Sequence, residues 1–220
     1  DFYIKSNESV FPKNYYDLSE QDKFEVLSNV KGALNPDDFE NEITRLTIES
    51  IQAIKVIQGN NGELGANRYI ISNNENALNV METFALIRLS DWENPTVDVV
   101  PLFESVDDLL NAHNVMEQLY TNPVYANHLV NREMKQTIML GFSDGTKDGG
   151  YLMANWSIYK AKEELTAISR KYGIKVIFFD GRGGPPSRGG GKTHKFYASL
   201  GPKIENNEIQ ITVQGQTISS

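Results

Sequence analysis

The chain has 220 residues, with 21 Lys and Arg against 29 Asp and Glu, a formal net charge of −8 and 40% hydrophobic residues. This composition is typical of a globular protein, and its acidic excess argues against both nucleic acid and anionic membrane surfaces as partners. The absence of Cys excludes disulfides, zinc–thiolate sites and thiol nucleophiles. With no apolar run near the ~20 residues of a membrane span and no signal-peptide pattern, we expect a cytoplasmic piece of a longer protein.

The first part of the chain reads as helical and shows no chemistry. Ser19, followed three residues later by Asp22, is typical of a capping box and predicts a helix start. A second helix is predicted from Pro36 to Gly59, before a turn at 60–62. Its apolar side consists of Leu46, Ile48, Ile51, Ile54, Val56 and Ile57.

From residue 67 onward, short apolar runs alternate with longer amphipathic segments, which is the pattern of parallel βα units. We therefore predict two parts, a helical segment over 1–66 and a βα region over 67–220. The predicted strands cover 68–72, 97–103, 136–141, 175–179 and 209–213.

The predicted helices lie between these strands. They begin near Glu75, after a second capping box at Ser105 and Asp108, and at Pro123. The longest covers 152–172 and ends at Gly173. His113 and His128 fall within helical segments, and we predict packing or surface roles for both, whereas His194 follows a Gly-rich loop.

Five strands joined by helical crossovers predict an α/β fold with a parallel sheet, either doubly wound or part of a (β/α)8 barrel. A whole barrel needs eight strands and about 250 residues. We therefore predict a partial (β/α)8 TIM-type barrel, preceded by the helical segment and cut from a larger protein.

Polar residues follow three consecutive predicted strands, where ligand sites of parallel βα folds form. Glu104 follows the second strand, Asp144 and Lys147 follow the third, and a Gly- and Arg-rich run follows the fourth. We expect all three segments to share one rim of the sheet.

The carboxylates of Glu104 and Asp144 could together hold a hard divalent cation such as Mg²⁺ or Mn²⁺. A structural interpretation competes with this one. In it, Glu104 is a favourable charge at a helix N-terminus and Asp144 forms a turn.

The run over 181–191, named here the Gly/Arg loop, predicts a phosphate or other oxyanion site. Arg182 and Arg188 supply bidentate guanidinium groups, and the glycines expose backbone N–H groups. A Walker loop and a dinucleotide fingerprint both require Gly where Pro186 stands. An RNA-binding Arg-Gly-Gly segment or a plain surface loop are the other interpretations. The glycines flanking the arginines are Gly183, Gly184, Gly189 and Gly190.

Three motifs together carry a resemblance to a known family. They are PLFESVDD at 101–108, GFSDGTKDG at 141–149 and GRGGPPSRGGGKTH at 181–194. In this order and spacing they resemble phosphoenolpyruvate carboxylase, and the similarity runs from about residue 19 to the end. Members of that family are several times longer, so the chain is similar to a central fragment of the catalytic barrel.

The resemblance implies a role for each matching residue. Glu104 and Asp144 would ligate Mg²⁺ or Mn²⁺, and Lys147 would lie beside the substrate. Arg182 would hold the phosphate of phosphoenolpyruvate, with the neighbouring loop glycines, and Arg188 would act in carboxylation.

The resemblance also implies a reaction. In the family, bicarbonate attacks the phosphate of phosphoenolpyruvate, and carboxyphosphate and a metal-bound enolate lead to oxaloacetate and phosphate. The family is tetrameric, its loop is implicated in inhibition by aspartate, and further catalytic residues belong to other segments. We therefore expect a homo-oligomeric full-length enzyme and an inactive isolated fragment.

The sequence departs from the family pattern at three places. Asp180 stands where the family usually has His, and Gln216 where it usually has Glu. The run 185–187 is Pro-Pro-Ser, which should stiffen the loop. An acid at 180 is expected to pair with Arg182 and compete for the phosphate.

Two other functions are compatible with these residues. One is a barrel module that binds phosphate or another anion without turnover, which Asp180 and the two prolines favour. The other is a different metal-dependent lyase or aldolase of the enolate type. It would share the metal site without requiring both arginines.

Overall fold

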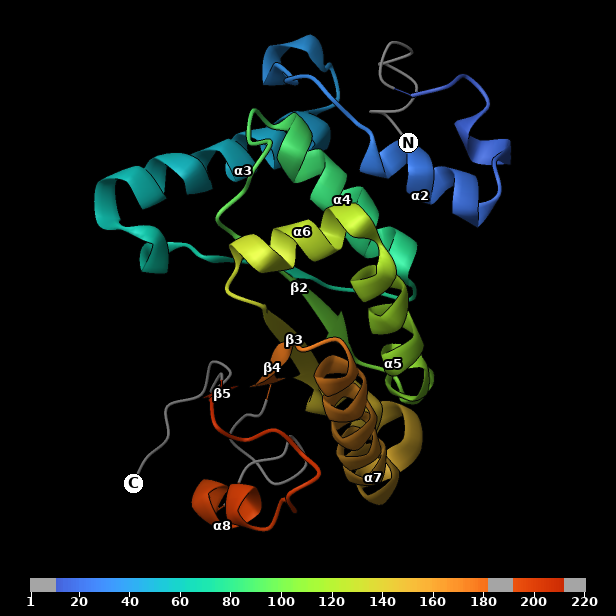
Figure 1. The fold of residues 1–220 in the computed structure, drawn as a ribbon, viewed down its shortest axis with the longest axis vertical. Helices are drawn as coiled ribbons and strands as arrows, with labels where there is room; N and C mark the ends of the chain where they lie inside the picture. The colour runs from blue at the N-terminus through green and yellow to red at the C-terminus, as the bar shows by residue number, and fades with distance from the viewer. Residues whose placement is uncertain (1–10, 182–191, 212–220) are drawn as a thin grey trace. The chain divides into compact units, whose positions relative to one another are not determined.

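The computed structural model describes residues 11–181 and 192–211, apart from the side chains at 143–146, 148 and 193. Five strands alternate with helices in the second part of the chain (Figure 1). The strands are β1 (Arg68–Ile71), β2 (Asp98–Phe103), β3 (Lys135–Gly141), β4 (Lys175–Gly181) and β5 (Ile209–Ile211). The α-helices are α2 (Glu20–Ser28), α3 (Glu42–Asn61), α4 (Ala77–Leu89), α5 (Val106–Thr121), α6 (Pro123–Asn131), α7 (Phe142–Lys171) and α8 (Thr193–Ala198). Short 3₁₀ turns are η1 (Tyr15–Asp17), η2 (Pro36–Asp38) and η3 (Glu63–Gly65).

The strands form one sheet in the order β1-β2-β3-β4-β5, which is also their order in the chain. Strands β2 to β5 pair in parallel with their neighbours. A doubly wound fold would reverse its order partway across the sheet, whereas a barrel adds each strand beside the last. The predicted α/β fold with a parallel sheet is confirmed, and the sequential order favours the partial barrel.

The five strands lie within two residues of their predicted starts and ends wherever the structure describes them. The interiors of β2 and β4 are mainly Val, Ile, Leu and Phe, which suit a strand covered on both faces. Six of the seven residues of β4 are fully or partly buried. The predicted end of the last strand at 212 and 213 lies outside the described residues.

The chain divides into two compact units, each interrupted in sequence. One contains residues 1–69 and 78–99, and the other contains 70–77 and 100–220. The helix α4 thus groups with the helices that precede it. The boundary predicted at 66/67 rests on the change in sequence pattern and stays a prediction.

In the second unit, α5 and α7 pack against each other beside β3 and β4 (Figure 1). Leu109, Val115 and Leu119 of α5 are buried, as are Ile158 and Leu165 of α7. Each such side chain contributes roughly 1.5–3 kcal/mol through burial. Gly173, with φ of +68°, ends α7 in the left-handed conformation predicted for it.

In the first unit, the predicted start of α2 is confirmed, because Ser19 Oγ accepts a hydrogen bond from the Asp22 N–H. The predicted start of the next helix at Pro36 is wrong. Pro36 opens the separate turn η2, and α3 begins at Glu42, where the Asn41 side chain accepts from the Thr44 N–H at 2.9 Å.

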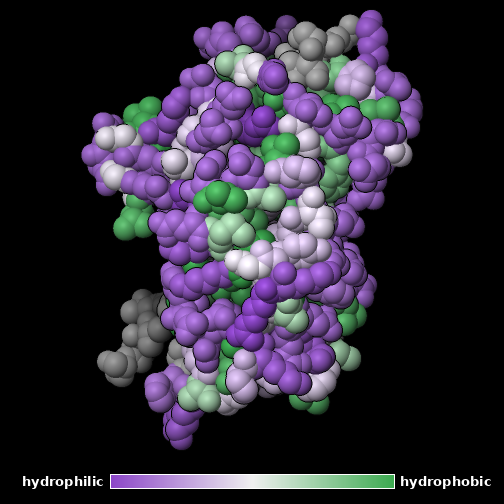
Figure 2. All heavy atoms as spheres, in the orientation of Figure 1, coloured by the Kyte–Doolittle hydropathy of each residue, from purple (hydrophilic) through white to green (hydrophobic). Residues whose placement is uncertain are grey.

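The predicted apolar side of α3 is only partly buried. Ile48 and Ile51 are buried, whereas Leu46, Val56 and Ile57 are 51%, 62% and 39% exposed. The face of the molecule drawn in Figure 2 is mainly hydrophilic and carries separate hydrophobic patches. Within the described residues, no helix combines the length and apolar character needed to cross a bilayer.

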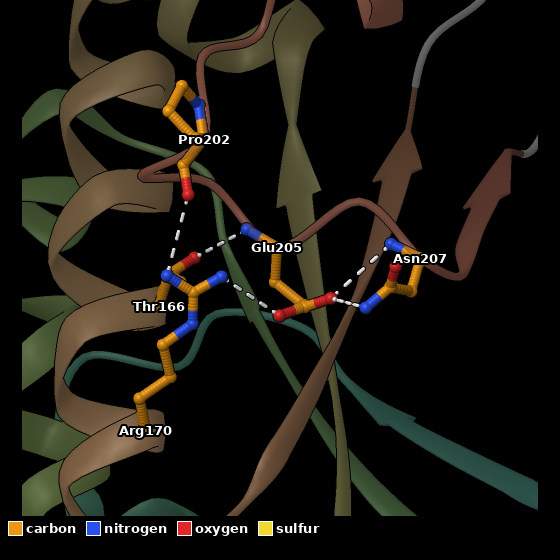
Figure 3. Close-up of polar contacts among 5 residues, drawn as sticks. All are labelled: Thr166, Arg170, Pro202, Glu205 and Asn207. Atoms are coloured by element: carbon orange, nitrogen blue, oxygen red, sulfur yellow. Dashed lines mark hydrogen bonds and ion pairs between the residues drawn. The ribbon is translucent and has the colours of Figure 1, made fainter.

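The segment between α8 and β5 contacts α7 through a small group of polar side chains (Figure 3). The Glu205 N–H donates to Thr166 Oγ1 at 3.0 Å, and Arg170 Nη2 lies 3.1 Å from Glu205 Oε2. The second carboxylate oxygen of Glu205 accepts from both nitrogens of Asn207. These contacts fix the approach of the chain to β5.

Candidate functional site

The carboxyl ends of β2, β3 and β4 meet at one edge of the sheet. Phe103 is level with Leu140, and Leu140 with Asp180. The next residues along these strands are Glu104, Gly141 and Gly181, so the three predicted segments begin at the same level. The sheet register therefore brings together the backbone positions from which the candidate site is built.

Glu104 lies directly against the end of β3. It is half-buried, and a Cβ built on Gly141 would lie 3.3 Å from Glu104 Cγ. Gly181 is similarly crowded, since a Cβ there would lie 3.2 Å from the Leu140 carbonyl oxygen. Glycine at these two strand ends allows the strands and the Glu104 side chain to approach closely.

The backbone after Glu104 is fixed by the capping box predicted from the sequence. Asp108 N–H donates to Ser105 Oγ, and Ser105 N–H donates to Asp108 Oδ2, both at 3.1 Å. The two bonds satisfy N–H groups at the start of α5. They also hold the residue next to Glu104 in one conformation.

The segment predicted as a loop after β3 is helical, and that prediction is wrong. The helix α7 begins at Phe142, ten residues before its predicted start, and Gly150 interrupts it with φ of +77°. Positions 144 and 147 thus lie on the first turns of α7, where Lys147 is exposed. The side chain of Asp144 is outside the described residues.

Gly149 holds this first part of α7 close to α5. A Cβ at 149 would lie 2.9 Å from Met153 Cγ and 3.1 Å from Val106 Cγ2. Val106 follows Ser105, so the beginnings of α5 and α7 are packed together at the edge that carries Glu104. The result is a close approach of the segments after β2 and β3.

Asp180 is fully buried and has partners that the sequence did not predict. Its Oδ2 lies 2.6 Å from Lys162 Nζ of α7, and it accepts a hydrogen bond from the Tyr197 hydroxyl of α8. The expected partner, Arg182, lies outside the described residues. Lys162 could have been found from its spacing, because it stands four residues after Ile158 and three before Leu165 on the buried side of α7.

Much of the predicted anion site lies outside the described residues. This applies to Arg182, Gly183, Gly184, Arg188, Gly189 and Gly190, and also to Pro185, Pro186, Ser187 and Gln216. The structure describes the flanks of the Gly/Arg loop, which are the end of β4 on one side and α8 on the other.

The donors predicted for a divalent cation are of the right chemical type. Glu104 supplies a hard carboxylate at the sheet edge, where the missing side chain of Gly141 makes room for it. Among the described residues, no group of three or more His, Asp or Glu side chains is arranged to hold a metal ion. Mg²⁺ is typically bound by one or two protein carboxylates together with water and substrate oxygens.

Comparison with known proteins matches residues 5–220 to the family model for phosphoenolpyruvate carboxylase. Relatives include the phosphoenolpyruvate carboxylases of Nitrosomonas eutropha, 33% identical over 219 residues, and Gloeobacter violaceus, 34% identical over 215. That of Rhodothermus marinus is 35% identical over 210 residues.

These matches cover 94%, 94% and 89% of the chain. They cover 23%, 23% and 22% of the three relatives, so the chain spans less than a quarter of their length. A match over nearly the whole chain, together with the sequential parallel sheet, places this chain in the phosphoenolpyruvate carboxylase family.

Proposed function

We propose that the chain is part of an enzyme that carboxylates phosphoenolpyruvate with bicarbonate, giving oxaloacetate and phosphate. The observation that carries the proposal is the family match over residues 5–220, joined to a sheet register that sets Glu104 and the flanks of the Gly/Arg loop at one edge. We place the enzyme in the cytoplasm, as a homo-oligomer.

The proposed reaction transfers one phosphoryl group and forms one carbon–carbon bond. A bicarbonate oxygen attacks phosphorus, and the bond from phosphorus to the enol oxygen breaks. Carboxyphosphate then releases CO₂ and phosphate, and C3 of the pyruvate enolate attacks CO₂ to give oxaloacetate. Cationic groups favour both steps, because breaking the bond from phosphorus leaves negative charge on the enolate oxygen, and forming the carbon–carbon bond moves that charge to the new carboxylate.

Each candidate residue has a role that suits its chemistry. Arg182 and Arg188, with the backbone N–H groups of the loop glycines, would bind the phosphoryl and carboxylate oxygens. Lys147 would add a positive charge beside the substrate. Glu104 and Asp144 would hold Mg²⁺ or Mn²⁺, which supplies Lewis-acid stabilisation of the developing negative charge.

The test is an assay for oxaloacetate with the full-length protein, phosphoenolpyruvate, bicarbonate and Mg²⁺ or Mn²⁺. Arg188→Ala and Asp144→Ala should each reduce kcat at least a hundredfold, the scale of removing a group that stabilises a transition state. Matched controls are Arg170→Ala, which loses a surface ion pair with Glu205, and Asp37→Ala at an exposed turn. Both controls should keep full activity.

A folded full-length protein that binds metal and phosphoenolpyruvate but forms no oxaloacetate would overturn the proposal. That outcome would support an anion-binding module without turnover. Metal-dependent turnover of another substrate that survives Arg188→Ala would instead indicate a different enolate-type lyase.

A further inference from the structure

A buried ionic cluster lies beside the candidate site but takes no part in the chemistry proposed above. Lys162 Nζ and the Tyr197 hydroxyl both contact Asp180 Oδ2, at 2.6 and 2.5 Å. The Lys162 and Asp180 side chains are 1% and 0% exposed. A buried charge is stable only when it is paired, so these groups depend on one another.

Aromatic rings surround the ammonium group of Lys162. Its Nζ lies 5.1 Å from the centre of the Phe178 ring, 5.8 Å from Phe196 and 5.4 Å from Tyr197. These distances fall within the range of cation–π attraction. Strand and helix therefore both contact the same cation, which restricts how either can move relative to α7.

The cluster joins residues from both sides of the Gly/Arg loop. Asp180 is the second-last residue of β4, and Tyr197 lies on α8, which begins at Thr193. The ten residues between the described flanks, 182–191, carry Arg182 and Arg188. One carboxylate oxygen thus links the chain on both sides of the Gly/Arg loop, and Lys162 links that oxygen to α7.

The Asp180 side chain projects from the face of β4 that α7 covers. Asp180 stands two residues after Phe178, so both side chains leave β4 on the same face. That face is the one covered by α7, as the contacts of both residues with Lys162 show. The Asp180 carboxylate therefore lies between β4 and α7, and its contacts hold the backbone of β4 just before the Gly/Arg loop.

We propose that Lys162, Asp180 and Tyr197 form a positioning cluster that fixes the distance between the end of β4 and α8, the two flanks of the Gly/Arg loop, and so favours binding of phosphoenolpyruvate. This inference deepens the proposed function and rests on it. The three side chains are positioning residues, since they act on the loop through its flanks.

The most informative variant is Tyr197→Phe. It removes one hydrogen bond from Asp180 but keeps the aromatic ring and the Lys162–Asp180 ion pair, so the protein should stay folded. The matched control is Tyr120→Phe, because the buried Tyr120 hydroxyl also has one partner, Ser169 Oγ at 3.0 Å, in the same unit. Ser169 lies near the other end of α7, away from the residues next to the loop.

Two measurements on the full-length protein test the cluster. In Tyr197→Phe we expect the KM for phosphoenolpyruvate to rise about tenfold, the size expected from loss of one charge-assisted hydrogen bond. We also expect backbone amides of 194–200 to exchange hydrogen about tenfold faster, while those near Glu205 keep their protection through the contacts in Figure 3. Tyr120→Phe should leave the KM and the exchange of 194–200 unchanged.

The two readouts separate this inference from the proposed function. Unchanged exchange in Tyr197→Phe would overturn the cluster as a link to α8. Faster exchange with an unchanged KM, or an equal rise of KM in Tyr120→Phe, would overturn its positioning role. If the unmodified protein forms no oxaloacetate, the proposed function and the effect of the cluster on phosphoenolpyruvate binding fail together, and exchange then tests the link to α8 alone.

Discussion

Glu104 lies across the end of β3 at a place where Gly141 has no side chain to obstruct it. A methyl group at 141 would come within 3.3 Å of Glu104 Cγ and 3.4 Å of its Cα and Cβ. Because a contact of that length forces one partner to move, the orientation of the Glu104 carboxylate depends on a glycine of the neighbouring strand.

Gly141→Ala should weaken divalent cation binding. The backbone at 141 has φ of −88°, which any residue can adopt, so the effect of the substitution is steric. We expect the Mn²⁺ concentration for half-maximal activity to rise about tenfold, as for other changes next to a metal ligand. The matched control is Gly59→Ala in α3, which meets no atom within 4 Å. Equal Mn²⁺ requirements in both variants would contradict the prediction.

Ser105→Ala should reduce stability and metal binding together. Loss of a helix N-cap costs about 1 kcal/mol, and Ser105 directly follows Glu104. Ser19→Ala removes an equivalent cap from α2 and should cost a similar amount without affecting metal binding. Melting temperature and the Mn²⁺ requirement, measured for both variants of the full-length protein, decide between the two outcomes. An unchanged Mn²⁺ requirement in Ser105→Ala would show that the cap does not orient Glu104.

His128 should make the protein less stable as the solution becomes acidic. Burial lowers the pKa of His128 to about 4, and the charge of Arg132 adds to the effect. In the unfolded chain the His128 imidazole binds a proton near pH 6.5, whereas in the folded protein it does so only near pH 4. The contribution of buried, neutral His128 to the free energy of unfolding is therefore fully present above pH 6.5. It decreases by up to about 3 kcal/mol as the pH drops to 4.

The variant His128→Gln should show a smaller decrease over the same pH interval. Urea or thermal unfolding of both proteins at pH 7, 6, 5 and 4 measures the difference. Parallel curves for the two proteins would show that other groups cause the acid sensitivity. Of the two roles predicted for His128, packing or surface, the structure shows packing, because His128 is buried with its ring centre 5.9 Å from that of Tyr125.

Lys162→Met should be strongly destabilising. It leaves the carboxylate of Asp180 buried without its cation, a change that typically costs about 3–5 kcal/mol. The double variant Lys162→Met with Asp180→Asn removes both charges and should recover most of that loss. Melting temperatures of the full-length variants provide the comparison. A double variant as unstable as the single one would show that the ion pair itself contributes more than the avoidance of an unpaired charge.

The strands and capped helices could be predicted because their signals are local. An apolar run such as 175–179 needs only its own composition to be read as a strand, and the box at Ser105 and Asp108 needs four residues. The start of α3 was misplaced because Pro36 is a valid first residue both for a long helix and for a short turn. Asn41 caps the actual helix, but Thr44 stands three residues later where a capping box has Glu or Gln, so the sequence marks this start less clearly.

The first turns of α7 and the cluster around Asp180 could not be read in the same way. Residues 143–150 are rich in Gly, Ser and Asp, which favour a loop when judged alone, but packing of Gly149 against Val106 favours a helix there. Lys162 and Asp180 are 18 positions apart on different elements, and only the fold brings their charges together. Which residues of the candidate site carry chemistry stays a prediction from the sequence, and the structure adds how the described ones among them are supported by their neighbours.

The sequential order of the strands also bears on how the protein is made. Each strand pairs with the strand synthesised before it, as when Lys135 is joined by Lys175 about forty positions later. Contacts between nearby segments form faster than contacts between distant ones, because less of the chain must be ordered to close the loop. The sequential order therefore keeps the loop closed by each strand pairing about as short as a parallel connection allows.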